Sequence, residues 1–224
     1  MREVLGGGSG GRHYADGEDT IHVVPDSRNL PTEFTESRFP FRVEALGLAV
    51  DSGGAGRYRG GLGYEKCIRM LRDGHFMSIA DRSILACWGV RGGRAGQPFE
   101  VVIDPGGPHE RVVDALSDDE PVRAGELVRI RTTGGGGWGD PLDRPYDEVV
   151  RDLRWGKVSL SGAKRDYGVV VSGTPDQPVL DEAASDELRA ERRASADPEA
   201  PFFDRGPGYA RLSGGVPAAD VDWL

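Results

Sequence analysis

Glycine is the residue that most constrains how this chain can fold. The 224 residues include 34 glycines and 15 prolines, together about 22% of the chain against roughly 12% in an average protein. The glycines stand in short runs between apolar segments, as in "DSGGAGRYRGGLG" and "TTGGGGWGDP". We therefore predict a folded chain with many turns and loops. Its 38% hydrophobic content is enough for one sizeable core, so one principal domain is expected.

The charge balance restricts the partners of such a domain. The formal net charge is -9 at pH 7, whereas nucleic-acid and anionic-membrane surfaces need clustered Lys and Arg. The beginning, "MREVLGGGSGG", lacks the apolar core of a signal peptide, and no stretch approaches the roughly 18 apolar residues of a membrane span. We expect a cytoplasmic protein with small-molecule or protein partners, and neither a nucleic-acid nor a membrane partner.

Cysteine and histidine give little support for a metal site. Cys67 and Cys87 lie among apolar residues without CxxC spacing, which indicates buried free thiols. The four histidines are scattered. The segment "GRHYADGEDTIHVV" places Asp16, Glu18 and Asp19 between two of them and offers potential ligands. We favour solvated loop acids there, and no metal ligand is predicted.

Apolar periodicity predicts an α+β fold that is mainly β. Alternation favours half-buried strands in the segments "FRVEALGLAV", "YEKCIRML", "HFMSIADRSILACWG", "FEVVID" and "PVRAGELVRIRTT", whereas "ERVVDALS" is ambiguous between strand and helix. Residues 31–74 are punctuated by proline and are expected to be extended apart from their loops. The prediction is a glycine-rich domain with an antiparallel or mixed sheet, one or two C-terminal helices and a polar tail.

The predicted helices lie in the C-terminal third. "RPYDEVVRDLRWG" has apolar residues at spacings of three and four and ends in Gly156, and "SLSGAKRDYG" ends in Gly168. A short strand, "VVV", should follow. We draw one lobe over residues 1–171 and a polar tail over 172–224, partly ordered or docked on a partner, because the tail lacks a sustained apolar face.

The run of four glycines in "TTGGGGWGDP" raises the question of a phosphate loop. Gly134, Gly136 and Gly139 fit the GxGxxG spacing of dinucleotide folds, but Glu148 is too near to serve as the ribose-binding acid, and no Walker lysine follows. An anion-binding nest of free amides, with Asp140 capping the next turn, remains an alternative. The favoured interpretation is a tight structural turn packed under Trp138.

Other candidates for chemistry are polar residues near glycine loops. Asp81 and Arg82 follow an apolar run, where an ion pair at a strand end is the ordinary expectation. Arginines in the glycine loops can bind a carboxylate or phosphate through forked hydrogen bonds; these are Arg57, Arg59, Arg91 and Arg94. No GxSxG motif is present. The residues therefore predict no self-sufficient catalytic centre.

The order of the motifs carries a family resemblance. Six segments follow one another in the order and spacing of the C-terminal part of the B-type component of the hydantoinase/5-oxoprolinase family, which this chain resembles from about residue 4 to residue 171. They are "LGGGSGGRHYADGED", "NLPTEFTESRFPFRVE", "DSGGAGRYRGGLG", "ADRSILACWGVRGGRAGQP", "TTGGGGWGDPLDRP" and "VRDLRWGKVSLSGAKRDYGVV".

The resemblance implies ATP-dependent opening of a cyclic amide by A-type and B-type parts together. In that scheme the A-type part binds ATP and phosphorylates the substrate oxygen. Related assemblies carboxylate ketones such as acetone, so the fold does not fix the reaction. ATP and a divalent metal are implied for the complete complex, and an A-type subunit is the implied partner.

One departure limits what the resemblance transfers. B-type components of the family are more than twice as long, and their metal-binding residues lie in an N-terminal half that this sequence does not match. No catalytic or metal residue is therefore assigned. We expect a split-gene product, a truncation or a separately encoded lobe that joins the missing half. The substrate or interface candidates are Gly134, Gly135, Gly136, Gly137, Asp81 and Arg82; a non-catalytic assembly module is the third hypothesis.

Overall fold

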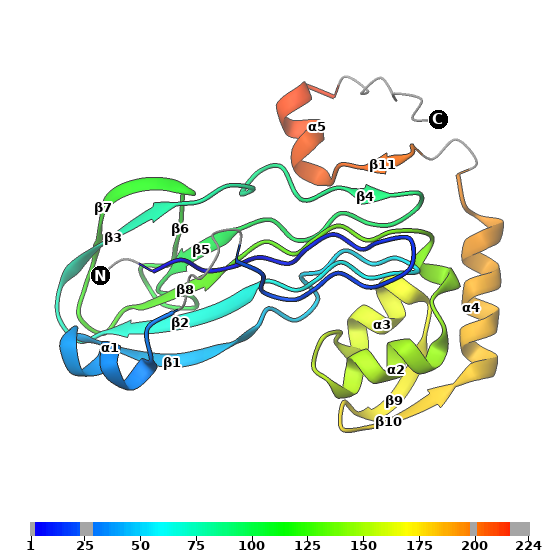
Figure 1. Ribbon diagram of the computed structural model, residues 1–224, viewed down its shortest axis with the longest axis horizontal. Coiled ribbons are helices and arrows are strands. Elements are labelled where there is room, and N and C mark those ends of the chain that lie inside the picture. The colour runs from blue at the N-terminus through cyan, green and yellow to red at the C-terminus, as the bar shows by residue number, and fades with distance from the viewer. Residues whose placement is uncertain (1–2, 23–28, 198–200, 216–224) are drawn as a thin grey trace.

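The computed structural model describes residues 3–22, 29–197 and 201–215. Figure 1 shows an elongated molecule with a β-sheet region at one end and a helical region at the other, joined by long extended segments. Strand is more abundant than helix, and every strand pair is antiparallel. The predicted α+β, mainly β class is confirmed. None of the helices in the described residues is long and apolar enough to span a membrane.

The largest sheet has five strands in the order β1-β2-β8-β5-β6. The strands are β1 (Phe41–Leu48), β2 (Tyr64–Met70), β5 (Glu100–Ile103), β6 (Arg111–Val113) and β8 (Leu127–Arg131). Apolar side chains of β5, β6 and β8 form a core with Val122; its buried members are Val101, Ile103, Val113, Val122, Val128 and Ile130. The strands predicted in "FRVEALGLAV", "YEKCIRML", "FEVVID" and "PVRAGELVRIRTT" are thus confirmed.

Two elements near this sheet differ from the predictions. Residues 31–74 were expected to be extended, but α1 (Thr32–Arg38) is a helix, which Pro31, an acidic first turn and a basic last turn favour. The ambiguous segment "ERVVDALS" is strand, divided between β6 and β7 (Leu116–Val122). β7 pairs with β3 (Gly74–Ile79), so only the beginning of "HFMSIADRSILACWG" continues as that strand.

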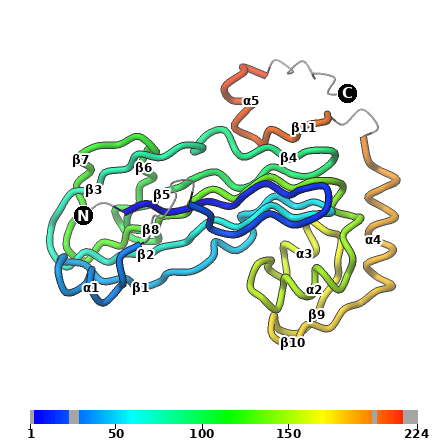
Figure 2. The backbone as a smooth tube through the Cα atoms, in the orientation of Figure 1, coloured from blue at the N-terminus to red at the C-terminus, as the bar shows by residue number. Residues whose placement is uncertain are grey.

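Glycine-rich segments run side by side through the middle of the molecule, as Figures 1 and 2 show. We call these segments the glycine core; they are residues 8–11, 52–55, 58–61, 87–90, 93–97 and 134–138. They exchange main-chain hydrogen bonds, such as that from the Gly61 amide to the Ser9 carbonyl at 2.8 Å. The core is therefore held by backbone contacts rather than by side-chain packing.

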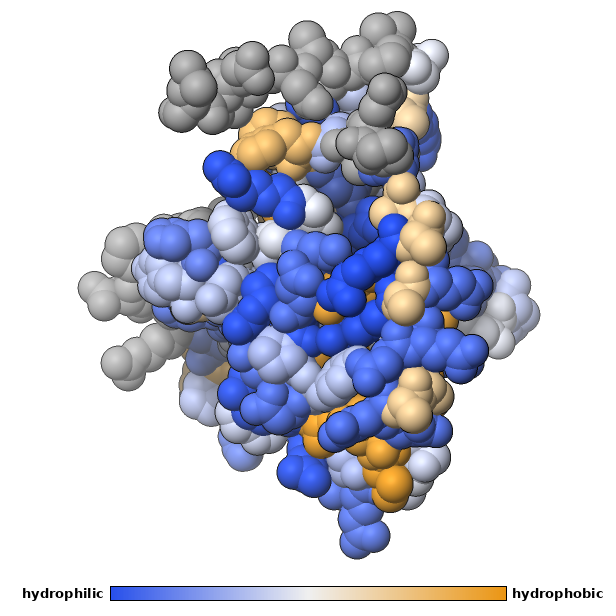
Figure 3. All heavy atoms as spheres, turned by 90° about the vertical axis from the view of Figure 1, so that its right-hand side faces the viewer, coloured by the Kyte–Doolittle hydropathy of each residue, from blue (hydrophilic) through white to orange (hydrophobic). Residues whose placement is uncertain are grey.

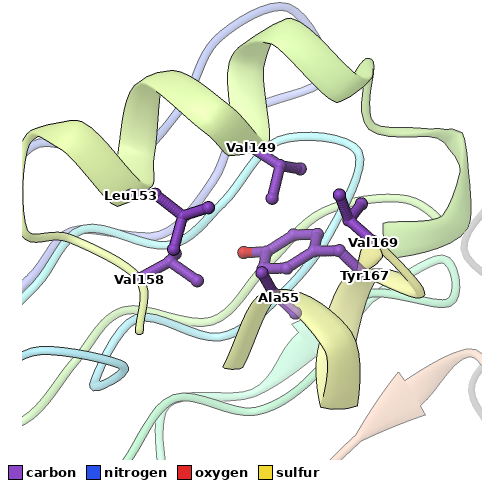
Figure 4. Packing of buried hydrophobic residues seen from close by; sticks show 7 residues of the cluster. Ala55, Val149, Leu153, Val158, Tyr167 and Val169 are labelled. Carbon is purple, nitrogen blue, oxygen red and sulfur yellow. The ribbon is translucent and has the colours of Figure 1, made fainter. Parts of the chain in front are cut away.

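The helical region packs around a buried tyrosine. Helices α2 (Tyr146–Arg154) and α3 (Leu160–Tyr167) match the two predicted helices and end before left-handed glycines at 156 and 168. Asp140 caps the preceding turn η1 (Pro141–Asp143), as expected, by accepting from the Leu142 amide at 2.8 Å. Figure 4 shows the Tyr167 ring among apolar side chains from α2, from the residues that flank α3 and from the glycine core, namely Val149, Leu153, Val158, Val169 and Ala55.

Residues 172–197 contain more regular secondary structure than their polar composition indicates. Strands β9 (Val170–Thr174) and β10 (Gln177–Asp181) form a hairpin, and α4 (Glu182–Ala194) follows. The outward face of the molecule on the side of α4 is mainly hydrophilic (Figure 3). Arg189 nevertheless is 7% exposed and donates to the carbonyls of Tyr167 and Arg144, both at 2.9 Å. Polar hydrogen bonds therefore help to dock this helix.

The remaining elements return to the glycine core. β11 (Phe203–Asp204) pairs with β4 (Gly89–Val90), and the short helix α5 (Pro207–Ser213) follows it. The Phe203 ring lies 5.6 Å from that of Trp88, so this segment contacts the glycine core. The boundary of the predicted lobe at residue 171 stays a prediction. Its tail includes 198–200 and 216–224, which lie outside the described residues.

Candidate functional site: a cleft beside the glycine core

The four glycines 134–137 are the central segment of the glycine core. They are buried and extended, so the predicted tight turn is wrong. Three of their amides donate to main-chain carbonyls: Gly134 to Gln97, Gly135 to Gly61 and Gly137 to Arg94, at 2.9–3.1 Å. Their carbonyls accept from the amides of Gly11, Gly54 and Val90. These neighbours belong to five other segments, whereas a strand in a flat sheet has two neighbours.

Such close packing of backbones requires glycine. A Cβ atom built on any of the four residues would lie within 3.0 Å of a carbonyl oxygen, that of Ser52, Ser9, Trp88 or Ala55. Those oxygens belong to the backbone and cannot swing aside as a long side chain can. Three of the four amides already donate to carbonyls of the protein, so few amides remain for the anion-binding nest considered above. The contact of these glycines with substrate or an interface stays a prediction.

In the part of the chain that the structure describes, Asp81 and Arg82 share no main-chain hydrogen bond with this segment. Both are exposed in the loop after β3, where Arg82 has a φ of 66° and its carbonyl accepts from the Phe99 amide. Within the described residues neither forms an ion pair, so the ordinary expectation for them is wrong. Their contact with substrate or an interface, like that of the four glycines, stays a prediction.

The loop acids that sequence offered as metal ligands bind cations of the protein instead. Asp16 receives two hydrogen bonds of 2.7 Å from the guanidinium of Arg144, which also donates to Asp152 at 2.8 Å. Arg59 donates to Asp152 and Asp19 at 3.4 Å. The solvated-acid interpretation is therefore wrong for Asp16 and Asp19, whereas Glu18 is exposed and, among the described residues, pairs only with Arg12 at the surface. We call this group the ion cluster; it ties the N-terminal segment to helix α2.

Burial and pairing set the protonation of the ion cluster. Burial by itself would raise the pKa of Asp16, but the hydrogen bonds and positive charges of Arg144 and Arg59 outweigh it and lower the pKa. Burial likewise opposes the charge on Arg144, yet Asp16 and Asp152 raise its pKa well above the ordinary value. The cluster is charged and internally paired. No group of three or more His, Cys, Asp or Glu side chains in the described residues is placed to hold a metal.

The two cysteines are free, as predicted. Cys67 is buried and Cys87 is partly buried, and burial raises the pKa of both thiols. A thiol with a raised pKa remains protonated at neutral pH and is a poor nucleophile.

A polar cleft of about 400 Å³ opens beside the glycine core, next to helix α3. One wall is the backbone of residues 53–55, and Gly54 in that wall donates to the carbonyl of Gly135. The predicted glycine run thus lies directly behind the cleft wall. Charged side chains form much of the remaining lining; they are Asp51, Arg94, Arg131, Arg165 and Asp166.

Most of these charged groups have a protein partner. Arg165 binds Asp166 at 2.6 Å. The carboxylate of Asp51 accepts from both the amide and the hydroxyl of Ser159, at 2.8 and 2.6 Å. Arg131 binds Glu65 at 2.5 Å. The exception is Arg94, whose guanidinium has no ion pair or hydrogen bond among the described residues.

Sequence reasoning identified this site only in part. It singled out Arg94 as one of four loop arginines able to bind a carboxylate. Of the others, Arg57 binds Glu148 at 3.1 Å, Arg59 belongs to the ion cluster, and Arg91 lies over the Phe202 ring. Asp51, Arg131 and Arg165 were missed because they are distant in sequence, and no local pattern joins them.

Comparison with known proteins confirms the family. The family model for hydantoinase B/oxoprolinase matches residues 1–141. The chain is 30% identical over 189 residues to the putative B-type component of the D-/L-hydantoinase of Pseudomonas sp. (strain NS671), covering 84% of this chain and 31% of that protein.

Two solved structures share the fold. The ATP-dependent caprolactamase from Pseudomonas jessenii matches with a TM-score of 0.67 and 29% identity, over 84% of this chain and 33% of that one. The nucleotide-free acetone carboxylase structure matches with a TM-score of 0.72 and 24% identity, over 94% of this chain and 30% of that one. The chain thus spans about a third of the length of these relatives. It belongs to the hydantoinase B/oxoprolinase family.

Proposed function

We propose that this chain is the C-terminal lobe of an ATP-dependent cyclic-amide hydrolase. The observation that carries the proposal is the likeness, over 84% of this chain, to each of two relatives, the hydantoinase component and the ATP-dependent caprolactamase. The lobe would act with an A-type ATP-binding subunit and with the N-terminal portion that the longer relatives possess. By itself it is expected to be inactive.

The geometry supports a framework role for the lobe. The segments of the glycine core form hydrogen bonds with one another, and the arginines of the ion cluster bind its own aspartates. The acids nearest to the histidines of the N-terminal segment are engaged by arginine and lysine, for example Asp19 by Lys157 at 2.8 Å. These residues do not fit a divalent metal. We propose that other parts of the complex hold the metal and ATP.

Reconstitution tests the proposal. The chain would be combined with an A-type subunit and the N-terminal portion of a B-type component, and ATP hydrolysis would be measured with hydantoin, 5-oxoproline and caprolactam. Ring opening coupled to ATP hydrolysis, and dependent on this chain, is expected. A complex that assembles but never couples the two would contradict the proposal.

A ketone carboxylase is the second candidate. The acetone carboxylase chain shares the fold over 94% of this chain, the broader of the two structural matches. That candidate predicts ATP hydrolysis that requires bicarbonate together with acetone or acetophenone. The same reconstituted complex distinguishes the two, and a complex that consumes no ATP with either substrate class would favour a non-catalytic assembly module.

A further inference from the structure

We propose that the cleft lined by Asp51, Arg94, Arg165 and Asp166 binds a small organic carboxylate that also carries an amino or amide nitrogen. The proposal names a ligand class for the lobe and rests on the proposed function only for the link to the reaction. The cleft itself is a property of this chain. Its volume of about 400 Å³ lies within the range of small-molecule sites.

Arg94 provides the anion-binding group of the lining. Its amide donates to the Ala55 carbonyl at 2.7 Å, and its own carbonyl accepts from the Gly137 amide at 2.9 Å. The backbone that carries the side chain is therefore fixed in the glycine core. The guanidinium has no protein acceptor among the described residues. A planar guanidinium binds a carboxylate through two parallel, charge-assisted hydrogen bonds, which makes a carboxylate the fitting anion.

Asp51 and Asp166 provide hydrogen-bond acceptors in the same lining. Hydrogen bonds from Ser159 hold Asp51, and the bidentate pair with Arg165 holds Asp166. Each carboxylate oxygen can accept two hydrogen bonds, so both acids retain free acceptor capacity. They favour an ammonium or amide N–H donor and repel a second negative charge. A phosphate dianion is therefore disfavoured relative to a monocarboxylate that bears nitrogen.

The chemistry of the proposed reaction yields this class of molecule. Hydrolysis of a cyclic amide breaks the ring C–N bond and adds the elements of water, so that one product molecule carries both a carboxylate and a nitrogen group, an amine from a lactam or a carbamoyl nitrogen from a hydantoin. 5-Oxoproline, for example, opens to glutamate. The cleft fits such a product, or a cyclic-amide substrate that already bears a carboxylate.

Binding to the chain can be measured without any catalysis. We would titrate the uniformly ¹⁵N-labelled chain with glutamate and follow amide shifts, expecting saturable changes at residues 53–55 and 94–97. Glutarate, which lacks nitrogen, and glutaramide, which lacks a carboxylate, should each bind more weakly. Arg94→Gln should weaken glutamate about tenfold or more, as expected for the loss of a charge-assisted pair. Asp166→Asn should weaken glutamate but not glutarate.

Arg72→Gln is the matched control, since Arg72 is an exposed arginine beyond the far end of β2; its glutamate affinity should equal that of the unmodified chain. An unchanged amide spectrum away from the cleft shows that Arg94→Gln is folded. The proposal is overturned if glutamate causes no saturable shift, if Arg94→Gln binds normally, or if phosphate binds as well as glutamate. Failed reconstitution with intact glutamate binding would reject the proposed function and leave the cleft assignment standing.

Discussion

The glycine core and the helical region bury their backbones in different ways. In the helical region, apolar side chains exclude water around Tyr167, and the backbone groups form hydrogen bonds within each helix. In the glycine core the backbones contact one another directly, and residues 134–137 are hydrogen-bonded to five other segments. The first arrangement tolerates a change of side chain by repacking. The second has no side chain to adjust, so we expect it to be far less tolerant.

The largest effect is expected for Gly136→Ala. The new Cβ would lie within 3.0 Å of the carbonyl oxygen of Trp88, so the segment must move and lose hydrogen bonds. We expect a loss of more than ~3 kcal/mol in the free energy of unfolding, or no folded protein. Gly47→Ala is the control, because a Cβ there meets no atom within 4 Å. Urea unfolding of the two variants measures the difference; equal midpoints would refute the framework role.

Leu153→Ala tests the helical region. Leu153 is fully buried in the cluster around Tyr167, and such truncations cost about 2–5 kcal/mol. We expect a folded but destabilised protein in which amide exchange accelerates in α2 and α3 more than in the glycine core. Hydrogen exchange detected by mass spectrometry resolves the regions. Uniform acceleration throughout would show that the two regions unfold as one unit.

Asp16→Asn tests the ion cluster that joins the regions. In the folded chain the pKa of Asp16 is below its ordinary value of 3.8. The ionised carboxylate therefore stabilises the fold fully above that value, and this stabilisation is lost as the pH falls through the lowered pKa. We expect unfolding midpoints measured from about pH 6 to about pH 2 to fall less steeply in Asp16→Asn than in the unmodified chain. Parallel profiles would contradict the assignment.

The smallest effect is expected for Arg189→Gln, which removes the hydrogen bonds from α4 to the carbonyls of Tyr167 and Arg144. We expect about 1–3 kcal/mol of local destabilisation, seen as faster proteolysis within residues 182–194. Arg192→Gln is the matched variant, because Arg192 lies in the same helix but makes one exposed hydrogen bond, to the Arg165 carbonyl. Identical cleavage rates for the two variants would show that Arg189 does not dock α4.

The contrast also explains which features sequence could predict. Helix α2 follows from Val149 and Leu153 at a spacing of four and from Gly156 at its end, all of which are local signals. The glycine core could not be predicted, because hydrogen bonds such as that from Gly11 to Gly136 join residues far apart, and glycine has no side chain to reveal a pattern. The docking of α4 was missed because it depends on Arg189 rather than on an apolar face.

The candidate site was likewise predictable from the sequence only in part. Arg94 is identifiable from sequence as a loop arginine, but its availability is not, since Arg57 and Arg59 look alike in sequence and are occupied by Glu148 and Asp152. Only the folded chain distinguishes the guanidinium of Arg94, which has no partner among the described residues, from the paired ones of Arg57 and Arg59. Asp166 becomes part of the site because α3 lies beside the glycine core, which no local pattern indicates.

The packing of Gly136 has a consequence for how such a chain can diverge. The atom that a new side chain would strike is a main-chain carbonyl, which every amino acid at position 88 possesses. No second substitution there can restore the space, so a change at Gly136 has no compensating partner. We expect homologues to drift freely in the helices, where volumes can be exchanged, while the glycine positions neither vary nor covary. Methods that infer contacts from correlated substitutions would therefore find no signal at the centre of this fold.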